Sequence, residues 1–377
     1  MSVPRVGIVG ASGAVGAAAL ACLQAEGRFA LRGGYRHAPP AASSHVEWLT
    51  VDVDDSSSLA RFCEGCAIVL NAAGPSCRIG DRVARAADAA GADYVDAFGG
   101  EGLQRQLDAQ PLSAGRRAIH SAGVFPGLSG LLPRWLAAQG FDRVHTLSIW
   151  AGGRERCTPA AGADVLLSTV AGFGQAGAAW IDGRRVGGAL APQDGLELPG
   201  VPGRVHAQPF LTGELAQLAA ELGLRHAQWH TLAPSPRAAT LIGRWSGRLA
   251  ATPAIDPAML AQAVADLVEA ATLDLAGHAP YYRAVIELDG LRGGQPRHRR
   301  AVLRAGDSYR LSAAVAAAAV LALTDGSLPC GTHHAAETLD PAATLERLHR
   351  WRAYDGLDLV ELAPRDAATA VTEEGVL

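Results

Sequence analysis

The chain has 377 residues, of which 49% are hydrophobic and 19% are charged, and its formal net charge is −4. This length and composition allow two domains with buried cores and exclude an intrinsically disordered chain. The net negative charge argues against a general nucleic-acid coat protein. All 33 basic residues are Arg, so no Lys is present to form a Schiff base or to act as a general base.

The N-terminal third of the chain alternates between short apolar runs and helical segments. The apolar runs predict six strands, at residues 5–9, 29–35, 46–53, 67–71, 94–96 and 117–121. Helices are expected between them, at residues 17–24, 55–63, 80–90 and 102–114. Strands that alternate with helices over short links predict a doubly wound parallel sheet of the Rossmann type, and therefore an α/β fold.

Three regularly spaced glycines, Gly10, Gly13 and Gly16, follow the first strand and open the first helix. A side chain at this turn would block a pyrophosphate, whereas free backbone N–H groups and the helix N-terminus attract one. The strand, the turn and the helix occur in the required order, so a dinucleotide site is favoured over a merely tight turn. The expected phosphate contacts are Gly10, Ser12, Gly13, Ala14 and Val15.

The end of the second strand predicts which nicotinamide cofactor binds. An Asp or Glu there would bind the ribose 2′-hydroxyl of NAD, but the residues present are Gly33 to His37. Arg36 is suited to pairing with a 2′-phosphate, which favours NADP(H) over NAD(H); the alternative is an ordinary exposed Arg. Further cofactor contacts are expected at the ends of the third and fourth strands, namely from Asp52, Asn71, Ala73 and Gly74.

The rest of the chain predicts an α+β domain built on a mainly antiparallel sheet. Helices are expected at residues 128–139, 160–173, 259–275 and 311–323, and strands at residues 144–150, 281–288 and 298–303. The stretch 183–203 is rich in Gly and Pro and has no periodicity. We expect it to form a long loop over the active site.

Four segments, in this order, resemble the saccharopine dehydrogenase-like oxidoreductases. They are Val6–Gly16, Ile68–Pro75, Gly91–Asp96 and Gly123–Leu128, with a weaker likeness at Cys330–His334 and Glu337. The resemblance implies an N-terminal Rossmann domain, a catalytic domain inserted after the sixth strand, and a chain end that returns to the Rossmann side. It also implies hydride transfer between NAD(P)H and a C=N or activated C=C bond.

The resemblance, together with Pro126-Gly127 as a boundary, divides the chain into four parts. They are a dinucleotide-binding domain (1–127), a catalytic, substrate-binding and dimerisation domain (128–330), a return segment on the Rossmann domain (331–365) and a frayed tail (366–377). A homodimer is therefore expected. Neither a targeting signal nor a membrane span is recognised, so a cytoplasmic location is expected.

Two departures from the family bear on the substrate. Phe125 stands where members often carry an Asp before the Pro-Gly pair, and the Lys that the lysine-releasing branch uses is absent. Both favour a less charged substrate, such as a thiazoline or another cyclic imine, over an amino-acid amine, so we predict an NADPH-dependent imine reductase, in particular a thiazoline reductase of siderophore assembly. The alternatives are a trans-acting enoyl reductase of a polyketide or lipid assembly line and a non-catalytic NADP(H) sensor.

Reduction of a C=N bond also needs a proton for the nitrogen. Asp96 ends the fifth strand and His120 lies near the end of the sixth, at the edge where ligands bind, and both are candidate donors. Their alternative roles are a turn cap for Asp96 and a buried, hydrogen-bonded imidazole for His120. No metal site is expected, because the adjacent His333 and His334 would point in opposite directions on an extended chain.

A run of basic residues, Arg297-His298-Arg299-Arg300, lies in the last predicted strand of the second domain. Such a run is usually a solvated face of a sheet. Its alternative role is to dock an acidic carrier domain that bears the imine substrate on a phosphopantetheine tether. The net charge opposes nucleic acid as the partner.

Overall fold

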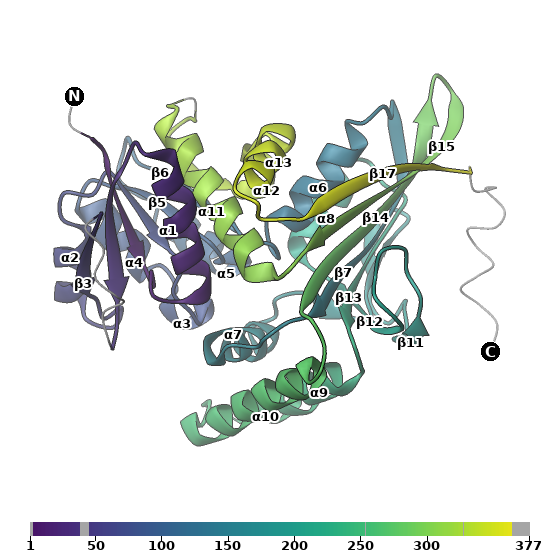
Figure 1. The fold of residues 1–377 in the computed structure, drawn as a ribbon, viewed down its shortest axis with the longest axis horizontal. Helices are drawn as coiled ribbons and strands as arrows, with labels where there is room; N and C mark the ends of the chain where they lie inside the picture. The colour runs from purple at the N-terminus through teal and green to yellow at the C-terminus, as the bar shows by residue number, and fades with distance from the viewer. Residues whose placement is uncertain (1–2, 38–44, 253, 327, 364–377) are drawn as a thin grey trace.

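The computed structural model describes residues 3–37, 45–252, 254–326 and 328–363. Two sheets lie side by side, with helices packed between them (Figure 1). One sheet is parallel and the other is mainly antiparallel, which confirms the predicted α/β fold with a Rossmann sheet and a second domain. The predicted frayed tail, residues 366–377, lies outside the described residues.

The first sheet contains seven parallel strands in the order β16-β6-β5-β4-β1-β2-β3. Its strands are β1 (Arg5–Val9), β2 (Ala30–Tyr35), β3 (Val46–Thr50), β4 (Ile68–Asn71), β5 (Asp93–Asp96), β6 (Arg117–His120) and β16 (Gly331–His334). The helices between β1 and β6 are α1 (Ala14–Glu26), α2 (Ser56–Cys63), α3 (Ser76–Ile79), α4 (Arg82–Ala89) and α5 (Gly100–Ala109). The first six strands have the Rossmann order, in which ligands bind beyond the carboxyl ends of the strands.

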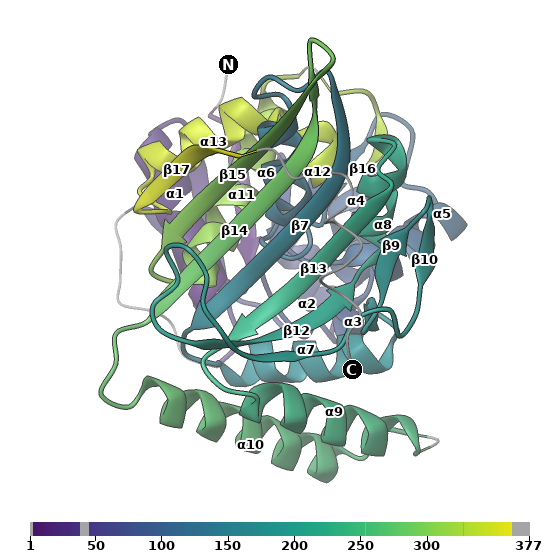
Figure 2. The same cartoon turned by 90° about the vertical axis from the view of Figure 1, so that its right-hand side faces the viewer.

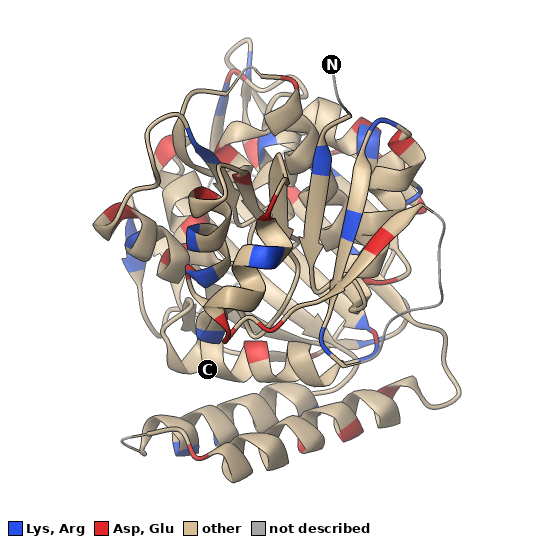
Figure 3. Ribbon diagram, turned by 90° about the vertical axis from the view of Figure 1, so that its left-hand side faces the viewer, with Lys and Arg blue, Asp and Glu red and all other residues tan. Residues whose placement is uncertain are grey.

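The central strands are apolar on both faces because helices cover both faces of the sheet. Along β4, Ile68 and Leu70 pack into the core that contains α1 and α11 (Ser308–Thr324), whereas Val69 packs against α2 and α4. The apolar run 311–323 is thus a buried helix, as predicted. Arg residues are interspersed with Asp and Glu on the Rossmann side of the molecule (Figure 3).

The second sheet contains ten strands, of which seven follow the order β10-β9-β13-β7-β14-β15-β17. Its strands are β7 (Arg143–Arg154), β8 (Gln175–Ala176), β9 (Ala179–Ile181), β10 (Arg184–Val186), β11 (Gln193–Leu196), β12 (Val205–Leu211), β13 (His226–Ala233), β14 (Tyr281–Arg292), β15 (Gln295–Ala305) and β17 (Gly356–Leu362). The pairings are antiparallel except for β13 with β7, as expected for a mainly antiparallel sheet.

Helices of the second domain occupy two places. α6 (Leu128–Ala137) and α8 (Gly213–Glu221) pack on the sheet face that looks toward the Rossmann domain. α7 (Pro159–Val170), α9 (Arg237–Ala250) and α10 (Pro257–Leu275) form a three-helix unit below both sheets (Figures 1 and 2). No helix in the part of the chain that the structure describes is long and apolar enough to span a membrane.

Three expectations about the second half differ from the structure. Helix α11, within the expected substrate domain, packs on α1 of the Rossmann domain. The segment after β16 contains α12 (Ala335–Thr338) and α13 (Pro341–Arg350), and then β17 pairs with β15 in the second sheet instead of packing on the Rossmann domain. The stretch 183–203 is not a plain loop over the active site, because it contains β10 and β11 and lies on the opposite face of the sheet.

The chain crosses between the domains at the start of α6, where a buried carboxylate holds the backbone. Glu214 of α8 accepts hydrogen bonds from the backbone N–H of Gly127, at 2.8 Å, and from the hydroxyl of Ser129. His334 lies 3.4 Å from the same carboxylate. Burial raises the pKa of Glu214 to about 7, and these hydrogen bonds oppose that rise.

Replacing Glu214 by Gln should make folding less sensitive to pH. A carboxyl whose pKa rises from 4.5 to about 7 on folding destabilises the folded state as pH increases across that interval. The size of this effect is about 3 kcal/mol at most, from about 1.4 kcal/mol per pH unit. Urea unfolding at pH 4.5 and pH 7.5 should show Glu214→Gln gaining stability relative to the wild type as pH rises.

The matched control is Glu221→Gln, on the same helix, whose carboxylate is part-exposed and paired with Arg134. Its pKa is lowered on folding, so the variant should show no such relative gain at pH 7.5. Equal pH dependence of Glu214→Gln and the wild type would show that Glu214 does not titrate in this interval.

Candidate active site

The glycine turn after β1 has the close contacts that a phosphate loop requires. Gly10 has a φ of +78°, and a Cβ added there would lie 2.8 Å from the backbone nitrogen of Ala73. A Cβ on Gly16 would overlap the carbonyl oxygen of Gly10, so Gly16 allows α1 to pack against the turn. The first and third glycines therefore let β1, α1 and the segment after β4 approach one another.

The middle of the turn is open toward solvent. Gly13 is the exposed N-cap of α1, and a Cβ there would meet only the Gly10 carbonyl, at 3.3 Å. The backbone N–H groups of Ser12 and Ala14 have no acceptor among the described residues. These donors, at the positive end of a helix, fit the pyrophosphate of a dinucleotide, which agrees with the predicted contacts at Gly10 and Ser12–Val15.

Two predicted cofactor contacts lie at the ends of neighbouring strands. Arg36 follows β2 and is exposed, and Asp52 follows β3, which pairs with β2. The Asp52 carboxylate accepts a hydrogen bond from the backbone N–H of Asp54 at 3.0 Å, and so stabilises the turn into α2. Arg36 thus remains a candidate for a 2′-phosphate, whereas Asp52 has a local structural partner.

A buried hydrogen-bond network joins the carboxyl ends of β4 and β5. Asp96 accepts hydrogen bonds from the Asn71 side-chain amide at 3.0 Å, from the Tyr94 hydroxyl, and from the backbone N–H of Phe98 at 2.8 Å. The Asn71 carbonyl oxygen in turn accepts from the N–H of Ala73 at 3.1 Å. Burial raises the pKa of Asp96, and its hydrogen bonds oppose that rise. These contacts give Asp96 and Asn71 the role of fixing the two loops.

His120 is also enclosed at the end of β6. Its Nε2 bonds the side-chain oxygen of Gln104, and its Nδ1 lies 2.9 Å from the hydroxyl of Ser121. Its ring packs edge-on against that of His334, with ring centroids 5.1 Å apart. Burial, followed by the neighbouring His334 and His333, lowers the pKa of His120 to about 3, so the ring is neutral at pH 7. Both ring nitrogens already have partners within the chain.

Another carboxylate reaches this edge from the second domain. Asp164 of α7 accepts hydrogen bonds on one oxygen, Oδ1, from the backbone N–H and the hydroxyl of Ser76, at 2.6 and 2.8 Å. Ser76 begins α3, directly after the predicted cofactor contacts at Ala73 and Gly74. The sequence carried a signal for this residue, since Asp164 is the one charged side chain in the apolar helix α7.

Aromatic rings from four segments gather beside the same edge. Phe125, in the loop after β6, stacks on Trp229 with ring centroids 4.5 Å apart. Its edges contact Phe173 and Phe210, at 5.6 and 6.3 Å between centroids. A Cβ on Gly100, after β5, would lie 3.5 Å from the Phe173 ring. We call Phe125, Phe173, Phe210 and Trp229 the aromatic cluster; Phe125, Phe173 and Phe210 remain part-exposed.

The arginines of the basic run are ion-paired within the chain. Arg297 and Arg299 both bind Glu361 of β17, at 2.9 and 2.7 Å. Arg300 binds Glu287 at 2.6 Å. Their charges are therefore largely balanced by neighbouring strands, so they offer an acidic carrier domain less positive charge than the sequence alone suggests.

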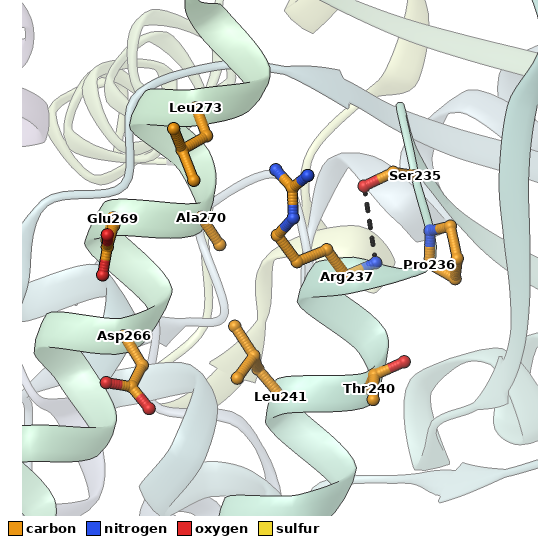
Figure 4. A pocket seen from close by; sticks show the side chains of 9 residues that line it. All are labelled: Ser235, Pro236, Arg237, Thr240, Leu241, Asp266, Glu269, Ala270 and Leu273. Carbon is orange, nitrogen blue, oxygen red and sulfur yellow. Dashed lines mark hydrogen bonds between the residues drawn. The ribbon is translucent and has the colours of Figure 1, made fainter.

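A groove of about 620 Å³ lies away from this edge, between α9 and α10 (Figure 4). Arg237 and Leu241 of α9 face Asp266, Glu269 and Leu273 of α10 across it. Arg237 binds Asp274 of α10 at 3.1 Å, and this ion pair links the two helices. The groove belongs to the three-helix unit and contains none of the predicted site residues.

Comparisons with known proteins agree with this arrangement. Residues 10–104 match the NAD(P)H-binding family, a segment that runs from the glycine turn into α5. A search of curated proteins found no match.

Two solved structures are similar over nearly the whole chain. Saccharopine dehydrogenase (L-Glu forming) from Saccharomyces cerevisiae is 15% identical, with a TM-score of 0.67, and the match covers 96% of this chain and 100% of that one. The C. glutamicum DAP dehydrogenase in complex with DAP is also 15% identical, with a TM-score of 0.50 and coverage of 93% and 99%. The chain therefore carries an N-terminal NAD(P)H-binding Rossmann domain and shares the overall fold of saccharopine dehydrogenase.

Proposed function

We propose that this protein is an NADPH-dependent reductase that transfers a hydride to the C=N bond of an uncharged imine. The observation that carries the proposal is the meeting of two features at one sheet edge. The glycine turn offers a dinucleotide site, and the second domain places a carboxylate and an aromatic cluster beside the loops after β4, β5 and β6. A bound NADPH would supply the hydride, and the chain would bind the substrate and exclude water.

The aromatic cluster supports an uncharged substrate. Phe125 occupies the loop after β6 and stacks on Trp229, so the wall here is apolar and aromatic. A carboxylate would lose its hydration against such a wall without gaining a partner. A thiazoline or another cyclic imine next to an unsaturated group would stack on it.

The proposed activity is tested by following NADPH oxidation at 340 nm with several unsaturated compounds. We expect turnover of 2-phenyl-2-thiazoline and of other cyclic imines. Turnover of α,β-unsaturated thioesters alone would favour an enoyl reductase. NADPH binding without turnover of either class would favour a cofactor sensor.

Substitution of Arg36 should test the choice of cofactor. If its guanidinium binds the 2′-phosphate, the wild type should bind NADPH more tightly than NADH, and Arg36→Ala should lose this preference. We expect NADPH affinity to fall by about tenfold, as for a lost charge-assisted contact, with NADH affinity unchanged. Fluorescence titration with both cofactors measures this. An Arg36→Ala variant that keeps its preference for NADPH would exclude the contact.

Substitution of Gly13 should test the position of the pyrophosphate. A Val side chain at this exposed N-cap would project from the turn toward the expected phosphates but would not enter the core. Gly13→Val should therefore abolish NADPH binding while the circular dichroism spectrum and melting temperature change little. Retained NADPH binding would place the cofactor elsewhere.

The aromatic cluster is tested through Phe125. An aromatic pair contributes about 0.5–1.5 kcal/mol beyond the area it buries, which corresponds to a change of about threefold to tenfold in binding. Phe125→Ala should raise KM for 2-phenyl-2-thiazoline by about this factor. The matched control substrate is 1-pyrroline, which lacks the phenyl ring and should show a smaller change. Equal effects on both substrates would mean that Phe125 acts only in packing.

A further inference from the structure

We propose that Asp164 donates the proton to the imine nitrogen in this reduction. The proposal rests on the proposed function and identifies the acid that the reaction needs. Hydride from the dihydronicotinamide adds to the imine carbon, and the π electrons of the C=N bond move to nitrogen. The nitrogen takes the proton from Oδ2 of Asp164, giving the amine and a carboxylate that is reprotonated from water.

The position of Asp164 is the first argument. Asp164 accepts both of its hydrogen bonds from Ser76, which lies two residues after Gly74 and at the same edge as the glycine turn. This places a carboxyl group of the second domain beside the segment expected to contact the nicotinamide and its ribose. Phe173, which follows α7, lies beside Gly100 after β5, where an added Cβ would be 3.5 Å from its ring. Helix α7 and the residue after it therefore contribute both a polar side chain, Asp164, and an apolar one, Phe173, to the lining of the candidate site.

The free oxygen of Asp164 is the second argument. The two bonds from Ser76 use Oδ1 alone, and Oδ2 has no partner among the described residues. Asp96, in contrast, accepts from three different groups. His120 has a partner at each ring nitrogen. Of these three candidates, Asp164 retains an atom able to carry a transferable proton.

Burial of Asp164 agrees with this role. Burial raises its pKa above 3.8, and the two hydrogen bonds from Ser76 oppose that rise. The neighbouring titratable groups at this edge are Cys77 and Arg78 on α3 and Asp96 on β5. Burial, and then the Asp164 carboxylate, raises the pKa of Cys77, and the same carboxylate contributes to the raised pKa of Asp96. Arg78 is exposed to solvent, and the causes of the shifted Asp164 pKa are burial and the two hydrogen bonds from Ser76, with no contribution from an arginine.

Of the six charges on helices α9 and α10, which pack against α7, four pair with one another. These helices carry the cations Arg237, Arg244 and Arg248 on α9 and the anions Asp266, Glu269 and Asp274 on α10. Arg244 binds Asp266 at 3.0 Å, and Arg237 binds Asp274 at 3.1 Å. Arg248 lies over the ring of Trp245. The pKa of Asp164 is therefore set mainly by burial and by Ser76.

The chain contains a control carboxylate that has the same two kinds of donor but accepts one hydrogen bond on each oxygen, so that neither oxygen is left without a partner. Glu155 accepts hydrogen bonds from the backbone N–H and the hydroxyl of Ser308, both at 2.7 Å, at the N-terminus of α11. Burial raises its pKa as well. Glu155 therefore resembles Asp164 in chemistry but caps a helix outside the candidate site.

The test measures kcat and kcat/KM from pH 5 to pH 9 for the full-length protein with NADPH and 2-phenyl-2-thiazoline. An acid must be protonated to act, so wild-type activity should fall as pH rises through the pKa of Asp164. Asp164→Asn keeps an acceptor for Ser76 but has no acidic proton. It should lower kcat by about a hundredfold or more, with NADPH affinity unchanged. It should also remove the fall in activity at high pH, which we call the alkaline limb of the pH profile.

Ser76→Ala gives a second, independent readout. It removes the hydroxyl that stabilises the Asp164 carboxylate, so the pKa of the acid should rise and the alkaline limb should move to higher pH. Glu155→Gln should leave the limb in place. This shift also decides the question if Asp164→Asn does not fold.

The outcomes separate this assignment from the proposed function. If the wild type reduces no imine, the proposed function fails and the assignment fails with it. If the wild type reduces imines but the alkaline limb is the same in both Asp164→Asn and Ser76→Ala, the reduction stands and Asp164 is only a cap for α3. In that case the limb belongs to the substrate, which would bind already protonated.

Discussion

A buried carboxylate at the end of β5 fixes the edge of the sheet on which the rest of the site depends. Asp96 binds the amide of Asn71 on the neighbouring strand and the backbone N–H of Phe98 in its own loop. Such a group is costly to bury unless its oxygens are satisfied, and here three donors satisfy them. The loops after β4 and β5 are consequently held in one arrangement, and Ser76 begins α3 at a fixed position beside them.

Two aspartates a short distance apart acquire different roles because their donors differ. The hydrogen bonds of Asp96 come from two strands and a loop, and they occupy both of its oxygens. Asp164 receives both of its bonds from Ser76 on one oxygen. Burial raises the pKa of both groups. The number and direction of donors, and not burial alone, distinguish a structural carboxylate from a candidate acid.

The second domain contributes to the site by covering the strand ends. Helix α7 and the residue Phe173 after it close over the loops that follow β4 and β5, and β12 and β13 supply Phe210 and Trp229. The chain then returns through α11 to the Rossmann domain and through β17 to the second sheet. The chain thus passes between the two domains more than once. These connections hold the two sheets next to each other, as a site with residues from both domains requires.

The sequence alone determined the features whose signals are local. The glycine turn, the apolar strands and the buried helix α11 were predictable because close backbone approach and two-sided burial each require particular residue types over a few positions. The tertiary structure alone decided which carboxylate, Asp96 or Asp164, keeps an oxygen without a hydrogen-bond partner among the described residues. Asp96 looked like a donor until its partners Asn71 and Tyr94 were in place, and Asp164 lies 88 residues from its partner Ser76. Contacts at such separations depend on how the two domains pack, which no local pattern encodes.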